Sequence, residues 1–213
     1  MPADYSFRQT ADPIADQLVV QLYQTQDKQR IAQLYRHLLS DIEEVDYQGL
    51  PFLVKAYFQQ NQGLPDWINW AQIRQVQQLY LSMGAEYASA LILRALPIGY
   101  SSANIVKLLA KTGYLASDKR TGTAKRLLET SQFLFNMMRE DCFEHNSVGL
   151  KHILKVRFIH AMVRHHLHKH KWDVQSRGLP INQEDMSMTI LTFSVGAIKG
   201  LERMNIALSR ADK

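Results

Sequence analysis

A histidine flanked by two arginines, inside an otherwise apolar segment, is the feature that most constrains this chain. Val156–Arg164 places these residues in the spacing Arg-x-x-His-x-x-x-Arg. On a helix, Arg157, His160 and Arg164 project from one face, and the apolar side chains beside them predict that this face is buried. Burying two guanidinium groups costs on the order of several kcal/mol each unless negative charge meets them. We therefore expect an anionic partner in the core, next to a single imidazole.

A heme group would satisfy both demands of this segment. A single imidazole, without thiols or acids at ligand spacing, suits a metal that brings most of its own ligands. Heme iron can take His160, and the two propionates can take Arg157 and Arg164. The alternative is that His160 is a hydrogen-bonded core histidine, and the matched spacing of the arginines favours the ligand. The sequence thus predicts His160 as an iron ligand and Arg157 and Arg164 as cofactor-binding residues.

The size and composition of the chain favour one globular domain over 1–213. Of the 213 residues, 46% are apolar and 21% charged, as in ordinary soluble proteins. The only cysteine, Cys142, excludes an internal disulfide and a cysteine-rich metal site. The N-terminus shows no export signal, and the most apolar window, 87–100, is too short to span a bilayer. We expect a cytoplasmic protein without stable membrane insertion.

The positive charge of the chain is concentrated in one segment. The formal net charge is +5, and Ser147–Arg177 contains four lysines, three arginines and one acid, a net of +6. The rest of the chain therefore sums to −1. A nucleic-acid partner would require a broader basic surface with base-reading groups. A local anionic partner explains the charge more economically, and we do not expect nucleic-acid binding.

The hydrophobic pattern is helical nearly throughout and predicts an all-α fold. No segment shows sustained alternation of apolar and polar residues. Ser101 or Ser102, Asp118 and Asn182 are expected to cap helices, and Leu96–Gly99 is expected to form a turn. An N-terminal helical region covers 1–60. The expected helices span 13–23, 28–41, 51–59, 68–96 with a break near Gly84, 102–111, 119–139, 147–171 and 183–207.

The helix expected at 119–139 carries a second set of candidate site residues. Arg126, Glu129 and Thr130 share one face with Phe133. Arg126 and Glu129 alone could form a surface ion pair, worth about a few tenths of a kcal/mol. The functional interpretation places this face opposite His160, across a pocket. Thr130 could then bind a ligand by a hydrogen bond, and Glu129 could act as an acid or base.

Seven of the eight histidines lie between His145 and His170. His166 and His170 have the i,i+4 spacing that can chelate zinc or nickel, but few carboxylates lie nearby to complete a site. The other histidines and the flanking lysines are expected to form a solvated helix end, where positive charge suits the helix dipole. His160 differs because its neighbours one turn away are apolar.

Four blocks of sequence resemble one enzyme family, the heme-dependent oxygenases that include the latex-clearing (rubber oxygenase) proteins and the oxygenase of mycophenolic acid biosynthesis. The resemblance covers about 67–208. Each block alone is weak evidence, but their order and spacing together are specific. The blocks are Lys111–Leu115, Arg126–Thr130, Arg157–Arg164, and Trp172-Asp173 followed by Gly178–Asp185 with Thr189 and Phe193-Ser194.

The resemblance implies a distantly globin-like helical fold that holds a b-type heme. His160 corresponds to the proximal iron ligand of the family, and Arg157 and Arg164 to arginines near the heme. Arg126 and Thr130 fall on the motif of the distal side. Characterised members cleave a carbon–carbon double bond of an isoprenoid chain with dioxygen. A small apolar substrate and dioxygen are therefore the expected partners, and the oligomeric state stays open.

Two departures from the family pattern qualify what the resemblance implies. Rubber oxygenases can carry a lysine at the position of Glu129, where it ligates the iron from the distal side. We hypothesise that Glu129 is instead a distal acid or base. Family domains also usually continue with further helices beyond the region that ends here at Lys213. The leading hypothesis is a heme b oxygenase; the alternatives are a heme-binding or sensing protein without turnover and a helical interaction module with a basic face.

Overall fold

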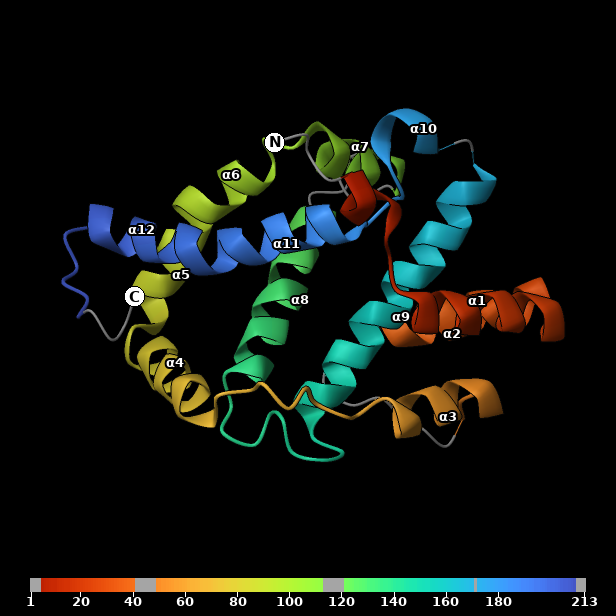
Figure 1. Cartoon of the computed structure of the whole chain (residues 1–213), viewed down its shortest axis with the longest axis horizontal. Helices are drawn as coiled ribbons and strands as arrows, with labels where there is room; N and C mark the ends of the chain where they lie inside the picture. Colours follow the sequence, from red (N-terminus) through yellow and green to blue (C-terminus); the bar gives the residue numbers. More distant parts are fainter. Residues whose placement is uncertain (1–4, 41–48, 113–120, 171, 210–213) are drawn as a thin grey trace. The chain divides into compact units, whose positions relative to one another are not determined.

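The described part of the chain is built from helices. The computed structural model describes residues 5–40, 49–112, 121–170 and 172–209. Within these ranges the regular elements are α-helices with short 3-10 and π-helical segments, and none is a β-strand (Figure 1). The predicted all-α fold is confirmed. The globin-like arrangement expected from the family stays a prediction.

The chain divides into two compact units. The first contains residues 1–11, 69–118 and 173–213, and the second contains 12–68 and 119–172. The single domain that the sequence favours stays a prediction. Each unit has its own helical packing, and the two are described in turn.

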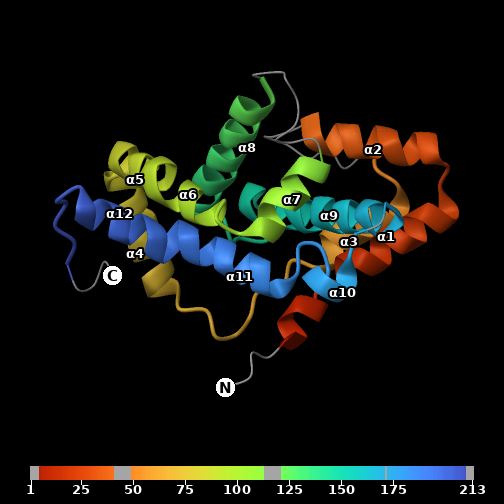
Figure 2. The ribbon, with the colours of Figure 1, turned by 90° about the horizontal axis from the view of Figure 1, so that it is seen from above.

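The second unit contains the long basic helix and most of the buried core. Ala15, Val54 and Phe158 are fully buried, so apolar stripes of three helices meet there. The helices α8 and α9 approach each other near the loop that joins them and diverge away from it (Figures 1 and 2). The elements of this unit are α1 (Pro13–Thr25), α2 (Lys28–Ser40), α3 (Phe52–Gln60), α8 (Thr121–Met137) and α9 (Val148–Lys169).

The first unit is made of shorter helices, two of which contain a π-helical segment. These segments, η2 and η3, pack against each other. Gly200 lies so close to Ala90 that an added Cβ would come within 2.8 Å of the Ala90 Cβ. The elements of this unit are η1 (Tyr5–Gln9), α4 (Trp70–Ser82), α5 (Gly84–Ala90), η2 (Leu91–Ala95), α6 (Leu96–Gly99), α7 (Ala103–Lys111), α10 (Val174–Arg177), α11 (Gln183–Leu191), η3 (Thr192–Gly196) and α12 (Ala197–Arg203).

The predicted turn at Leu96–Gly99 was wrong, because these residues continue a helix as α6. Proline lacks the N–H that a helix interior uses, which made a turn the expected result. The preceding η2 segment resolves the conflict. Its widened turn lets the Leu96 N–H donate to the carbonyl of Leu91, five residues back, and Pro97 follows in the first turn of α6, where a missing donor costs little.

The predicted helix boundaries agree closely with the structure elsewhere. The break near Gly84 is present, between α4 and α5. Asn182 caps α11 as predicted, since its side chain accepts a hydrogen bond from the Asp185 N–H at 2.9 Å. Ser102 stands at the N-cap of α7 without a side-chain capping bond, and Ser101 instead donates to the Ile98 carbonyl. The predicted cap at Asp118 lies outside the described residues.

Across the described ranges, no helix combines the length and the apolar character needed to cross a membrane.

Candidate functional site

Helix α9 is held firmly at its N-terminal end. The Ser147 hydroxyl accepts a hydrogen bond from the Leu150 N–H at 3.2 Å, which caps the helix. Gly149 lies directly against the preceding turn, because a Cβ built there would come within 2.3 Å of the Cys142 carbonyl oxygen. From this start α9 runs for 22 residues and presents one face to α1 and another to α8.

Arg157 forms a two-pronged ion pair with Asp12, which precedes α1. Its Nε donates to one carboxylate oxygen at 2.6 Å, and its Nη2 donates to the other at 3.0 Å. Asp12 is also the N-cap of α1 and accepts a hydrogen bond from the Ala15 N–H at 3.2 Å. The same carboxylate therefore begins α1 and fixes the guanidinium group of Arg157.

Arg164, two turns further along α9, is also paired with a carboxylate, that of Asp16 in α1. Its Nε donates to the Asp16 carboxylate at 2.7 Å, and its side chain is only 8% exposed. The negative charge predicted beside these arginines is thus present, and the chain itself supplies it. Arg157 and Arg164 therefore need no cofactor propionates to neutralise them, because Asp12 and Asp16 already supply the negative charge.

The buried setting of these pairs shifts the ionisation of the groups around them. Burial works to raise the pKa of Asp12, but the hydrogen bond and the charge of Arg157 outweigh it and leave that pKa below its usual value. Burial raises the pKa of Tyr57 well above its usual value. The Tyr57 hydroxyl donates to the Leu154 carbonyl of α9 at 3.2 Å. At neutral pH the Asp12 carboxylate is therefore charged and the Tyr57 hydroxyl is neutral.

His160 lies between the two faces of α9 and is half-buried. Towards α8, the ring of His152 hydrogen-bonds the Asn136 amide at 2.8 Å and packs against Phe133. At 3.6 residues per turn, His160 lies about 80° around the helix axis from His152. Arg164 lies about 120° from His152, in the same direction of rotation. The imidazole of His160 therefore points into the sector that separates the α8 contact from the α1 contact.

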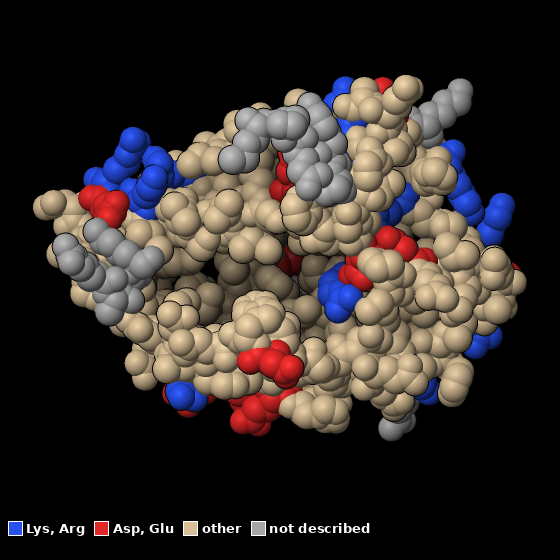
Figure 3. Space-filling view, in the orientation of Figure 1, with Lys and Arg blue, Asp and Glu red and all other residues tan. Residues whose placement is uncertain are grey.

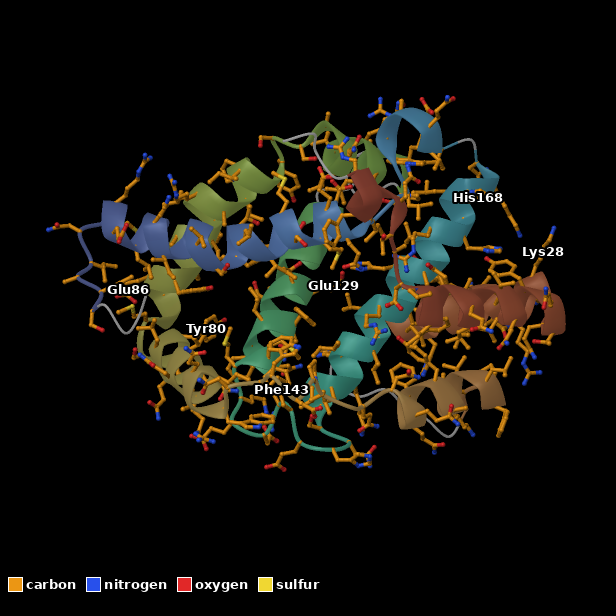
Figure 4. All side chains as sticks on the ribbon, viewed as in Figure 1. Lys28, Tyr80, Glu86, Glu129, Phe143 and His168 are labelled. Atoms are coloured by element: carbon orange, nitrogen blue, oxygen red, sulfur yellow. The ribbon has the colours of Figure 1, made fainter. Side chains whose placement is uncertain are left out.

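The other candidate residues lie on α8. Glu129, which Figure 4 labels, lies near the middle of the helix and is half-buried, as is its neighbour Thr130. Glu129 is seven residues before Asn136, so it projects from the side of α8 that contacts α9. Arg126 belongs to α8, but its side chain lies outside the described part of the structure. The predicted pocket between this face and His160 stays a prediction.

The histidines at the C-terminal end of α9 form a separate group. The rings of His165 and Tyr23 stack with centroids 4.1 Å apart, and the Lys169 amine lies 4.5 Å from the Tyr23 ring. The rings of His166 and His170 are 4.2 Å apart. Lysine and arginine side chains gather at this end of the second unit in Figure 3, around His168 and Lys28 in Figure 4. Among the described residues, no three histidine, cysteine or acidic side chains form a metal-binding group.

Sequence reasoning missed the two residues that complete the arginine site, Asp12 and Asp16. They are separated from their partners by 145 and 148 residues, so no local spacing connects the two helices. A signal was present in Asp12-Pro13, a typical helix start, followed by a second acid one turn later. The buried contact between Asn136 and His152 was missed for the same reason.

The comparison with protein families matches the part of the chain that carries most of these residues. The model of the ER-bound oxygenase mpaB/B'/rubber oxygenase catalytic domain matches residues 78–213. The match includes α8 and α9, whereas α1 with Asp16 precedes it. No curated protein and no solved structure matches the chain significantly. The chain therefore belongs to the ER-bound oxygenase mpaB/rubber oxygenase catalytic domain family, and by this membership it is an oxidoreductase.

Proposed function

We propose that this protein is a heme b-dependent oxygenase that uses dioxygen to cleave or oxygenate a carbon–carbon double bond of an apolar, isoprenoid-like substrate. The proposal is carried by a single imidazole, His160, which lies between two arginines on α9. The chain that contains this helix belongs to a family of oxygenases. This combination supports a cofactor that needs one protein ligand.

The donor set around His160 fits heme better than a bare metal ion. A bare zinc or non-heme iron ion requires three or more protein ligands, and the described residues contain no such group. Heme iron already has four ring nitrogens and takes one imidazole from the protein. His160 alone can therefore complete the protein's share of the ligands.

The two arginines, Arg157 and Arg164, would support His160 and would not themselves bind the iron. Their guanidinium groups already have carboxylate partners in Asp12 and Asp16. They would therefore act by fixing α9 and by placing positive charge near the cofactor. Direct anchoring of the propionates would require the Arg157–Asp12 or Arg164–Asp16 pair to open or to share its hydrogen bonds.

When bound, heme would be held by His160 and would supply an iron able to activate dioxygen. The candidate residues of α8 would serve the distal side, where dioxygen and the substrate would react. Glu129 would hold or deliver a proton, and Thr130 would donate a hydrogen bond. Arg126 would shape the same side. Leu128 and Phe135 share another face of α8, 69% and 48% exposed, and offer apolar surface to an apolar substrate.

Turnover of Glu129→Gln tests the chemical part of the proposal. The hemin-loaded protein should consume dioxygen with squalene, used here as a representative isoprenoid alkene, and form carbonyl products. Losing the acid while keeping its size should lower the rate by about 100-fold or more, with heme content unchanged. Glu140→Gln, an exposed carboxylate just beyond α8, should behave as wild type.

Two results would redirect the proposal. Full turnover in Glu129→Gln would contradict the role of Glu129 as a proton-transferring residue. A wild-type protein that binds heme but consumes no dioxygen with any alkene would favour a heme-binding or sensing protein. The cytoplasmic location expected from the sequence stays a prediction.

A further inference from the structure

Two carboxylates of α1 hold the arginines on both sides of His160. Arg157 lies about one turn before His160 on α9, and Arg164 lies about one turn after it. Asp12 and Asp16 are themselves one turn apart, at the start of α1. The two helices are therefore joined by one ion pair about a turn before His160 and by another about a turn after it.

We propose that Asp12 and Asp16 are positioning residues for His160. By holding Arg157 and Arg164 against α1, they fix the rotation of α9 and thus the direction in which the imidazole points. The inference rests on the proposed function of His160 as the iron ligand. It assigns a role in the site to a helix that precedes the part of the chain matched by the family model.

The geometry of the pairs supports this role. Arg157 contacts both oxygens of Asp12, and two parallel hydrogen bonds restrict orientation as well as distance. Each pair has one well-buried partner, since the Asp12 and Arg164 side chains are 15% and 8% exposed, whereas Arg157 and Asp16 are 35% and 34% exposed. Ala15 and Val19 of the same helix are buried in the core with Phe158 of α9. A ligand residue must be held to within about 0.5 Å, and this interface supplies the necessary support.

The alternative is that these ion pairs only attach α1 to the fold. The chain contains a suitable comparison, because Arg8 and Glu184 form a two-pronged pair in the other unit, with both contacts at 2.8 Å. That pair also joins the N-terminal region to a distant helix, α11. Removing its charge should affect attachment without any effect on His160.

The variant Asp12→Asn/Asp16→Asn removes both charges with little change in shape. Asparagine is as good an N-cap as aspartate, so α1 should still begin at the same residue. Glu184→Gln is the matched control. Asp16→Glu keeps the carboxylate and should retain most wild-type behaviour.

The first measurement uses the protein without cofactor. Diethyl pyrocarbonate modification, followed by peptide mass spectrometry, gives the reaction rate of His160 relative to exposed His37. We expect the relative rate to change at least threefold in the double variant and to stay within error in Glu184→Gln. The second measurement uses added hemin. Its dissociation rate should rise at least tenfold in the double variant, with a shifted electron paramagnetic resonance spectrum.

The outcomes separate this inference from the proposed function. Equal His160 modification rates in the wild type, the double variant and Glu184→Gln would overturn the positioning role. A wild-type protein that takes up no hemin would refute the proposed function, and the modification rates would still decide the positioning role. Hemin binding that is equally strong and spectroscopically identical in all variants would also overturn it.

Discussion

At the scale of single residues, the site depends on charges whose partners come from far along the chain. The half-buried Arg157 and the buried Arg164 required negative charge, and the structure provides it from Asp12 and Asp16. The sequence could predict this need because the cost of burying a guanidinium group is local. It could not identify the partners, because which helix packs against α9 depends on tertiary contacts.

The Asp12–Arg157 pair should make stability depend on pH. The pKa of Asp12 in the folded protein lies below its usual value of 3.8. The pair therefore stabilises fully above that usual value and is lost as the pH falls through the lowered pKa. In urea unfolding, Asp12→Asn should lose on the order of 1–2 kcal/mol at pH 7, and this difference should shrink as the pH falls below 3.8. A difference that stays constant down to pH 3 would contradict the account.

Gly149 should not tolerate a side chain. An added Cβ would lie 2.3 Å from the Cys142 carbonyl oxygen and 2.7 Å from its Cβ, so the turn before α9 would have to move. We expect Gly149→Ala to cost about 1–3 kcal/mol, seen as a lower Tm. Gly84→Ala, which places its Cβ in open space within a helix, should be neutral or slightly stabilising. Equal Tm values for both variants would show that the turn is not tightly packed.

At the scale of elements, the helices lie where the apolar periodicity predicts them. The observed helices differ from the predicted ones where that periodicity changes. Most predicted boundaries lie within two or three residues of those in the structure, as for α1 and α9. The segments η2 and η3 were not predicted, because an extra residue in one turn barely disturbs a hydrophobic pattern. Pro97 was therefore assigned to a turn, although the preceding wide turn lets the helix continue.

Tyr87 should stabilise the η3 segment. Its hydroxyl donates to the Phe193 carbonyl at 2.5 Å, and burial raises its pKa to about 12, so it stays a donor at neutral pH. Tyr87→Phe removes this bond and leaves a carbonyl in a poorly solvated place, which should cost about 1–2 kcal/mol in urea unfolding. Tyr80→Phe keeps the ring that packs edge-on against Tyr87 and should cost less. A larger loss in Tyr80→Phe would contradict this role for the hydroxyl.

At the scale of the whole molecule, the family match covers 78–213, which runs from the end of α4 through α8 and α9 to the C-terminal helices, whereas α1 precedes it. The sequence predicted the all-α class, because it depends on local pattern, and the candidate site residues on α8 and α9 stay predictions. It could not predict the division into two compact units, which depends on contacts between distant segments. The ion pairs that Asp12 and Asp16 make with α9 could not be predicted for the same reason.

Binding of heme by His160 is measured by the pyridine hemochrome assay of the purified protein. His160→Ala should be compared with His168→Ala, which removes an exposed histidine near the end of the same helix. The account predicts about one b-type heme per chain in the wild type and in His168→Ala, and almost none in His160→Ala. Wild-type heme content in His160→Ala, or a wild-type protein that fails to take up added hemin, would contradict the account.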